Sequence, residues 1–396
     1  MSERLLRPAL VLGLLSCIGP FAIDLYLPAM PAIAEGLHSS VPDMQATITA
    51  YFVAFGLAQL IYGPWADQSG RKPPLYAGIA IFALGSLICT LAPTTGWLIL
   101  GRAVQGFGGA ALMVVPRAII RDMYTGPAAT RLMAAVMLVI SVSPMLAPLV
   151  GSGLLAVAGW RSLFAALLVA AAVSLATLAF LQPETLKPEH RHPFRFAETW
   201  SAAGRLMTDA GFLCLTFMGG FGMASFFVFI ASAAFVYTEF YGLSPTGFSL
   251  AFAVNALGFF GASQAAGPLG ARMGARRVMA LATLGFGAVT VALFALVWAG
   301  ADHLLVVIGG LFLANACLGL VIPTAMVLAL DDHGDEAGLA SSLGGTLQMM
   351  TGAAMVAVAG PFFDGSPVPM LGAIAVCGVV AFVLGRLVPG PRAATA

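Results

Sequence analysis

The run PALVLGLLSCIGPFAIDLYLPAMP, residues 8–31, contains a single charged residue, Asp24. The rest of the run is apolar and long enough to cross the hydrocarbon core of a bilayer as a helix. A lone carboxylate in hydrocarbon costs several kcal/mol unless its site is wet, paired or protonated. The run therefore predicts a membrane-spanning helix that carries a functional ionisable group.

The composition of the whole chain extends this prediction. Hydrophobic residues make up 60% of the sequence and charged residues 9%, and the mean hydropathy is +0.96. Soluble domains carry about 25% charged residues. Apolar runs of similar length recur along the chain, so we expect an all-α polytopic membrane protein. The net charge of +1 and the lack of a basic domain predict no nucleic-acid partner.

The apolar runs predict twelve spans. They cover residues 8–30, 45–66, 74–92, 97–118, 130–156, 161–181, 211–237, 247–268, 276–299, 303–330, 338–360 and 368–388. A long polar stretch in the middle divides them six and six. We therefore expect one bundle over residues 1–182, a linker over 183–210 and a second bundle over 211–396.

The basic residues predict the orientation of these spans. Nearly all of them fall in loops on one side of the predicted topology; Arg161 lies on the other side and Arg102 lies within span four. Basic loops stay in the cytoplasm, so both termini and the linker are expected there, in a bacterial inner membrane. The predicted cytoplasmic loop 331–336, DDHGDE, is acidic apart from its histidine.

A short sequence repeats at an interval of about half the chain. GPWADQSGRK, residues 63–72, closes span two, and GPLGARMGAR, residues 267–276, closes span eight. Each copy follows the second span of its bundle and lies on the same predicted side. This repeat indicates a duplicated six-helix unit with parallel orientation.

These motifs resemble those of the major facilitator superfamily. The first copy of the repeat is similar to its loop 2–3 signature, and LILGRAVQGFGGA (98–110) and SPMLAPLVGSG (143–153) are similar to the fourth-helix and antiporter fifth-helix motifs. With IDLYLPAMP, GWRSLF, LQPETL and GMASFFVF, the chain resembles the Bcr/CflA subgroup of bicyclomycin and chloramphenicol exporters. The resemblance implies two pseudo-symmetric six-helix bundles and proton-coupled drug export by alternating access.

The repeat also predicts gating contacts at the cytoplasmic ends of the helices. Glycines allow close backbone approach there, and Arg71 could pair with Asp122 after span four. Asp67 could lie at a helix N-terminus of the other bundle, where the dipole favours an anion. Ala271 replaces this aspartate in the second copy, so we expect its arginines to pair with the acidic loop instead. The predicted gating residues of both copies are Gly63, Asp67, Gly70, Arg71, Lys72, Asp122, Arg272, Arg276 and Asp331.

Span five carries small residues and prolines at regular spacing. Ser143, Ala147 and Gly151 recur every four residues, which is the spacing of closely packed membrane helices. Pro144 and Pro148 remove backbone donors and are expected to kink the helix. The pattern fits tight packing and a hinge equally well. The resemblance implies that this motif limits leak through the transporter and sets the direction of antiport.

Polar and aromatic residues inside the spans are candidates for a substrate cavity. Flat apolar drugs are accommodated by aromatic walls with a few polar groups. Packing between helices or against lipid is the alternative for each of these side chains. The candidates are Tyr26, Gln105, Phe226, Phe229, Asn255 and Gln348.

Asp24 and Arg102 are predicted at similar depths in the first bundle. At 1.5 Å per residue, Asp24 lies about 24 Å along span one, and Arg102 lies about 7–8 Å into span four from the outside. Burial favours a neutral carboxyl group, whereas a nearby guanidinium favours the charged form. Competition between a proton and a drug at Asp24 would couple their gradients, with Arg102 as partner. A purely structural Asp24–Arg102 pair is the alternative.

Other functions are less consistent with the sequence. An importer of a sugar or organic acid on the same fold would need a more polar or basic cavity. A membrane enzyme needs a convergent catalytic or metal set, but all five histidines fall in predicted loops and the five cysteines form no CxxC pair. No nucleotide-binding P-loop is present. We therefore expect a non-enzyme that works as a monomer, since twelve helices suffice for a rocking mechanism, and that uses the proton gradient and no metal or cofactor.

Overall fold

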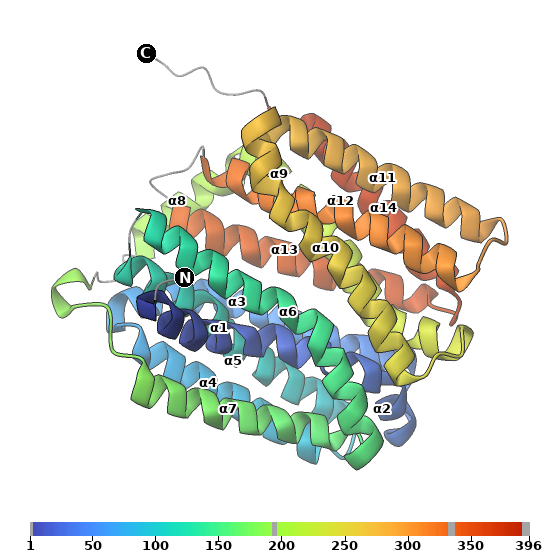
Figure 1. The fold of residues 1–396 in the computed structure, drawn as a ribbon, viewed down its shortest axis with the longest axis horizontal. Helices are drawn as coiled ribbons and strands as arrows, with labels where there is room; N and C mark the ends of the chain where they lie inside the picture. Colours follow the sequence, from blue (N-terminus) through green and yellow to red (C-terminus); the bar gives the residue numbers. More distant parts are fainter. Residues whose placement is uncertain (1–2, 125, 192–195, 332–336, 390–396) are drawn as a thin grey trace. The chain divides into compact units, whose positions relative to one another are not determined.

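The fold is that of a helical membrane protein. The computed structural model describes residues 3–124, 126–191, 196–331 and 337–389. Within these ranges, twelve helices are long and apolar enough to cross a membrane (Figure 1). Each coincides with one of the twelve predicted spans to within a few residues, so the predicted number and order of spans are confirmed.

The first half of the chain contains six of these spans. The first is interrupted, because α1 and α2 are separated by a short 3₁₀ turn, η1. The bounds are α1 Glu3–Asp24, η1 Leu27–Ala29, α2 Met30–Gly36, α3 Val41–Ser69, α4 Lys72–Leu91, α5 Thr95–Met123, α6 Gly126–Ala158 and α7 Arg161–Leu181.

The second half contains the other six spans. One of them, α9, ends in a turn of π-helix, η3, and another, α13, ends in a 3₁₀ turn, η5. The bounds are α9 Ala210–Phe235, η3 Val236–Phe240, α10 Pro245–Met273, α11 Ala275–Trp298, α12 Leu304–Asp331, α13 Ala337–Ala359, η5 Gly360–Phe362 and α14 Pro367–Leu387.

The linker contains a helix that the sequence analysis did not predict. After a 3₁₀ turn, η2 (Pro188–His190), helix α8 runs over Phe196–Thr208. Ala202 and Leu206, one helical turn apart, are buried, and Leu206 belongs to a hydrophobic core cluster with residues of α9, α11 and α12. The linker is therefore a packed amphipathic helix rather than only a polar connection.

The chain forms two compact units. Unit 1 comprises residues 1–194, 230–256 and 356–366, and unit 2 comprises residues 195–229, 257–355 and 367–396. Unit 1 thus includes the end of α9, the start of α10 and the end of α13. The predicted bundles, which end at residue 182 and begin at residue 211, are continuous segments of the chain, unlike the two units. That these bundles move as rigid bodies remains a prediction.

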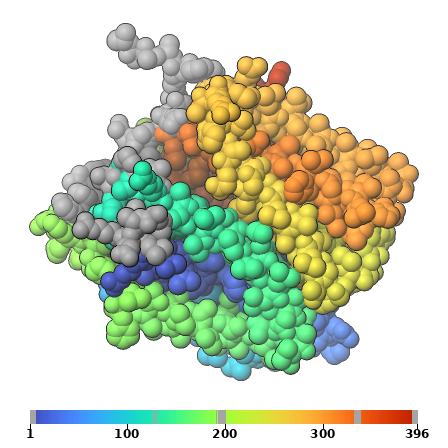
Figure 2. Space-filling view, in the orientation of Figure 1, coloured from blue at the N-terminus to red at the C-terminus, as the bar shows by residue number. Residues whose placement is uncertain are grey.

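Helices of unit 1 approach one another closely where glycines replace larger residues. A Cβ atom at Gly106 of α5 would overlap the carbonyl oxygen of Tyr51 in α3. The α3 helix itself begins with a capping box, in which Ser40 and Asp43 satisfy each other's backbone N–H groups. Helix α1 packs against α5, α6 and α7, and part of its surface is visible between α6 and α7 (Figure 2). These contacts position the site described next.

Candidate functional site

Asp24 is the last residue of α1, at a break in the first span. The break has a cause in the sequence. In an uninterrupted helix the carbonyl of Asp24 would accept a hydrogen bond from the N–H of residue 28, but that residue is Pro28, which has none. The chain turns through residues 25–29 and becomes helical again at Met30. Asp24 thus lies at a discontinuity in a membrane helix, where backbone groups are free to bind other partners.

One of the freed carbonyls is bound by Arg102. The N–H of Tyr26 donates to Ile23 rather than to Ala22. The carbonyl of Ala22 instead accepts from Nη1 of Arg102, at 3.2 Å. Helix α5 therefore places Arg102 beside the end of α1, at a carbonyl two residues from Asp24, in agreement with the similar depths that the sequence predicts.

The guanidinium of Arg102 lies between two tyrosine rings. Its central carbon is 4.8 Å from the centre of the Tyr26 ring and 4.5 Å from that of the Tyr51 ring. The hydroxyl of Tyr51 donates to the Gly19 carbonyl, and that of Tyr26 is hydrogen-bonded to Thr47 at 2.8 Å. Both rings are thereby fixed, and cation–π contacts on two faces stabilise a buried positive charge.

Gln105 completes the surroundings of Arg102. Its side-chain oxygen accepts from Nη1 of Arg102 at 2.5 Å, and its Nε2 donates to the hydroxyl of Ser86 at 2.7 Å. Arg102 and Gln105 are both completely buried. The structure therefore brings together three sequence-predicted residues, Tyr26, Arg102 and Gln105. Tyr51 and Ser86 were missed.

Asp24 itself is buried and not neutralised by a neighbouring cation. Its exposed fraction is 4%, and its Oδ2 atom has no hydrogen-bond partner among the described residues. None of the three ion pairs in the described part of the chain involves Asp24 or Arg102. Arg102 likewise keeps its Nε and Nη2 atoms without a partner there. A carboxylate in this state can bind and release a proton without breaking a salt bridge.

The other predicted cavity residues are distributed over both units. Phe229 is buried. Phe226 is partly buried and stacks on Phe259 of the same unit, with 5.9 Å between the ring centres. In unit 1, Nδ2 of Asn255 donates to the Ala251 carbonyl one turn earlier. In unit 2, Gln348 contributes to the wall of a small cavity between α9, α12 and α13. Within its own unit, each of these side chains packs against or bonds to its neighbours. That they share one cavity with Arg102 remains a prediction.

The small-residue stripe of α6 packs on α1. Ser143 and Ala147 are buried, and a Cβ atom at Gly151 would overlap the carbonyl oxygen of Leu25, inside the α1 break. Glycine at this position allows α6 to touch the interrupted backbone next to Asp24. Helix α6 continues through both Pro144 and Pro148. The carbonyl of Pro148 accepts from the hydroxyl of Ser249, 2.9 Å away.

The predicted Arg71–Asp122 pair is present. Nε and Nη2 of Arg71 donate to the two carboxylate oxygens of Asp122 at 2.7 and 3.0 Å, and Nη1 donates to Asp67 at 2.5 Å. The Arg71 side chain is 7% exposed. Burial alone would lower the pKa of Arg71, but the two carboxylates outweigh it and raise the pKa. The predicted contact of Asp67 with the other bundle would lie between the units and remains a prediction.

Glu184 binds the backbone of the same loop, a contact the sequence analysis missed. Its carboxylate accepts from the N–H groups of Arg71 and Lys72 at 2.9 and 3.0 Å, and from those of Thr185 and Leu186. The Thr185 hydroxyl donates to Asp122. We call this set (Asp67, Arg71, Asp122, Glu184 and Thr185) the latch. Burial would raise the pKa of Glu184, but the four backbone donors prevail and lower it.

The glycines of the repeat differ from one another. Gly70 has a φ of +94°, and a Cβ atom there would lie 2.8 Å from Oε2 of Glu184, so this position requires glycine. Gly63 lies within α3, and a Cβ atom there would meet no atom within 4 Å in the described part of the chain. No close backbone approach is therefore present at Gly63 among the described residues of unit 1, where the helix continues past it, and its gating role remains a prediction.

The second copy of the repeat forms a different contact. Nη1 of Arg276 donates to the carbonyl of Pro389, just beyond α14, at 2.6 Å. Arg272 lies in the last turn of α10. The side chain of Asp331 and the rest of the acidic loop lie outside the described residues, so the predicted pairing with this loop remains a prediction.

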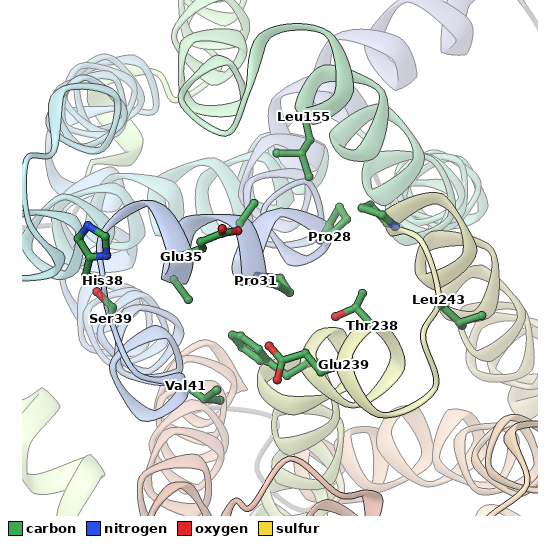
Figure 3. Close-up of a pocket in the computed structure, with 14 residues that line it drawn as sticks. Pro28, Pro31, Glu35, His38, Ser39, Val41, Leu155, Thr238, Glu239 and Leu243 are labelled. Carbon is green, nitrogen blue, oxygen red and sulfur yellow. The ribbon is translucent and has the colours of Figure 1, made fainter.

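A cavity of about 600 Å³ lies in unit 1 at the ends of the helices opposite the latch. Figure 3 shows Glu35 from α2 and Glu239 from η3 at the edges of the same opening. Proline, alanine, leucine and phenylalanine side chains form most of the wall, and its described lining residues include no lysine or arginine. Its volume is within the usual range for small-molecule sites, and its two carboxylates favour a cationic ligand.

Comparison with known proteins establishes the family. The family model of the Major Facilitator Superfamily matches residues 12–357, which is most of the chain and reaches from the first predicted span into the eleventh. The chain belongs to this superfamily. It is therefore a multi-pass membrane transporter and not an enzyme, as the sequence motifs predicted, and members of this superfamily with drug-resistance names imply a small-molecule substrate.

Several members of the superfamily are similar over much of their length. The chain is 33% identical to an uncharacterized MFS-type transporter, YdgK, of Bacillus subtilis over 94% of both chains. It is 29% identical to a bicyclomycin resistance protein homolog of Haemophilus influenzae, over 94% of this chain and 93% of that one. It is 31% identical to multidrug resistance protein D of Escherichia coli, over 66% of this chain and 65% of that one. These names agree with the predicted Bcr/CflA resemblance.

The superfamily fold is confirmed by a solved structure. A D-xylose–proton symporter superposes with a TM-score of 0.78 over 97% of this chain and 98% of that one. Its sequence is 14% identical, so this likeness establishes the fold alone.

Proposed function

We propose that this transporter exports small, largely apolar drugs across the bacterial inner membrane in exchange for protons. Asp24 is the proton-coupling carboxylate, and Arg102 tunes it. The observation that carries this proposal is a buried, unpaired carboxylate at the break in the first span. Intramembrane acids of this kind mark proton and substrate pathways. The similarity to proteins with drug-resistance names supports a drug as the exported molecule.

The coupling follows from competition at Asp24. Removal from water favours the proton-bound carboxyl group, whereas the positive charge of Arg102 favours the ionised form. A cationic or hydrogen-bonding drug that approaches Asp24 favours release of the proton. Release of the drug on the other side of the membrane lets a new proton bind. Reciprocal coupling of this kind links the two gradients. Because Asp24 is the one deep carboxylate in the predicted spans, the proposal takes one proton per cycle.

The remaining predicted residues serve alternating access in this proposal. The latch closes the cytoplasmic ends of the helices and opens as the two six-helix bundles rock. Phe226, Phe229, Asn255 and Gln348, with Tyr26 and Gln105, line the pathway of the drug. The transporter works as a monomer with both termini in the cytoplasm, takes its energy from the proton gradient, and needs no cofactor or metal. Its partners are protons, the drug and lipid, and not nucleic acid.

Transport of a metabolite, a sugar or an organic acid, is the second candidate function. The fold is shared with a sugar–proton symporter, and Arg102 could bind an organic anion. Its guanidinium, however, is already held by two aromatic rings, an amide and a carbonyl group. In the described part of the chain, Nε and Nη2 are left for an anion, so the transport assays below distinguish a tuning role from an anion site.

Drug accumulation in a pump-deficient host tests the proposal. The experiment compares wild type with Asp24→Asn, each with and without a protonophore, for a panel that includes bicyclomycin and chloramphenicol. We expect low accumulation only in wild-type cells without the protonophore. Equal accumulation in all four arms, together with uptake of a sugar or organic acid by wild type, would establish the metabolite function instead.

A further inference from the structure

A second cavity in unit 1 lies beside the latch. It has a volume of about 490 Å³ and is formed by the start of α1, the start of α4, the end of α5 and the end of α7. Two cationic side chains, Arg7 and Lys72, contribute to its wall, and none of its described lining residues is acidic. The rest of the wall is largely apolar: Pro8, Val11, Met123, Ala179, Phe180 and Leu181, with Gln182 and Pro183.

The two cations have no anionic partner in the part of the chain that the structure describes. Neither takes part in any of its three ion pairs. Two nearby acids with described side chains are already engaged, because Asp122 binds Arg71 and Thr185, and Glu184 accepts four backbone N–H groups. The ammonium of Lys72 lies 5.6 Å from the centre of the Tyr76 ring. The cavity thus holds two positive charges that a bound anion would neutralise.

Apolar side chains continue from the cavity along the outside of the helices. Phe180 is 84% exposed, and Leu10 and Leu14 of α1 are both more than half exposed. Helix α1 reaches the surface between α6 and α7 (Figure 2). In a protein with twelve apolar spans, such a surface contacts lipid tails. A ligand with an anionic head and an apolar tail matches both parts.

We propose that this cavity binds the headgroup of an anionic phospholipid. The phosphodiester lies between Arg7 and Lys72, and one acyl chain runs along α1 beside Phe180. A guanidinium binds phosphate oxygens through two parallel hydrogen bonds, and an ammonium adds a point charge. Basic pockets at helix ends on the side of the membrane rich in lysine and arginine suit such lipids. The site is separate from Asp24 and does not depend on the direction or substrate of transport.

Lipid retention by the purified full-length protein tests this inference. The protein in detergent is mixed with phosphatidylglycerol, or with phosphatidylcholine that has the same acyl chains, and bound lipid is counted by native mass spectrometry. We expect wild type to retain phosphatidylglycerol at least tenfold better than phosphatidylcholine. Arg7→Gln/Lys72→Gln should lose this preference, and the charge-conserving Arg7→Lys/Lys72→Arg should keep it.

The matched control is Arg277→Gln/Arg386→Gln, which removes two positive charges from unit 2. It should retain phosphatidylglycerol as wild type does. Equal retention by the two double glutamine variants would overturn the inference. A further arm adds inorganic phosphate, which should not displace the lipid. Displacement by millimolar phosphate would show a small-anion site and would also overturn it.

Discussion

Arg102 is positioned by groups that recognise its planar shape as well as its charge. Two rings, the Gln105 oxygen and the Ala22 carbonyl all contact the guanidinium. Lysine would keep the charge but has no planar group to fill the space between the two rings. We expect Arg102→Lys to lower the rate of proton-driven drug export about tenfold or more. The rate is measured as efflux of a fluorescent drug from energised cells.

Tyr51→Phe is the matched control for this prediction. It keeps the ring that stacks on Arg102 and removes the hydroxyl that donates to Gly19. Export should fall much less than in Tyr51→Leu, which removes the ring. A lysine variant that exports as fast as wild type would refute the proposed role of the cage around Arg102.

The sequence predicted the charged residues of this site and missed part of their surroundings. Asp24 and Arg102 are conspicuous because each is a charge within an apolar run. Tyr51 and Ser86 have no such signal, because tyrosine and serine are common in membrane helices for packing alone. Their role depends on which helix faces meet, and hydrophobic periodicity carries little information about this when every face is apolar.

At the scale of one element, α6 should be sensitive to substitution at Gly151 and tolerant two residues later. A methyl group at Gly151 would overlap the Leu25 carbonyl, whereas one at Gly153 would meet no described atom within 4 Å. Overpacking of this kind costs about 1–3 kcal/mol. We expect Gly151→Ala to lower both the melting temperature and the export rate. Gly153→Ala should export as wild type does and melt at the same or a slightly higher temperature, because alanine favours a helix where there is space for it. Equal behaviour of the two variants would show that α6 does not pack on the break as described.

The latch gives a pH-dependent prediction through Glu184. Since its pKa is lowered in the folded protein, the ionised carboxylate stabilises the fold at pH values above its ordinary pKa of 4.5. This contribution disappears as the pH falls through the lowered value. We expect Glu184→Gln to melt at a lower temperature than wild type at pH 7, and the difference to shrink as the pH falls below that ordinary value. Thermal unfolding in detergent measures it.

Glu189→Gln is the control in the same linker. Its carboxylate is largely exposed and 3.8 Å from Lys187, a geometry that adds little stability. The variant should melt as wild type does throughout the pH range. A Glu184→Gln difference that stays constant with pH would mean that the charge of Glu184 is not what holds the loop.

The elements themselves were largely predictable, and the exceptions have physical reasons. Twelve spans follow from hydrophobic length, which the bilayer imposes on every helix. Helix α8 was missed because its short apolar stripe is surrounded by polar residues. The prolines of LPAMP, residues 27–31, favour the break after Asp24, but prolines in membrane helices can also be accommodated without a break. Only contacts with α5 and α6 show what the freed backbone does.

At the scale of the whole molecule, the orientation in the membrane can be tested with fusions. An even number of spans places both termini on one side, and the basic residues predict that this side is the cytoplasm. Alkaline phosphatase, which is active only outside the cytoplasm, should be inactive after residue 389. It should be active after Asp302, in the connection between α11 and α12. The opposite pattern would invert the orientation and move the latch to the outside.

The direct test of proton coupling uses purified protein in liposomes with a pH gradient. Chloramphenicol, or the panel drug exported best by cells, is added, and proton movement and drug movement are recorded together for wild type and Asp24→Asn. Wild type should move protons only when drug is present and should concentrate the drug against its gradient. Asp24→Asn should still bind the drug, but it should not move protons in response to the drug or concentrate the drug against its gradient. Continued uphill drug movement driven by the pH gradient in Asp24→Asn would contradict the account.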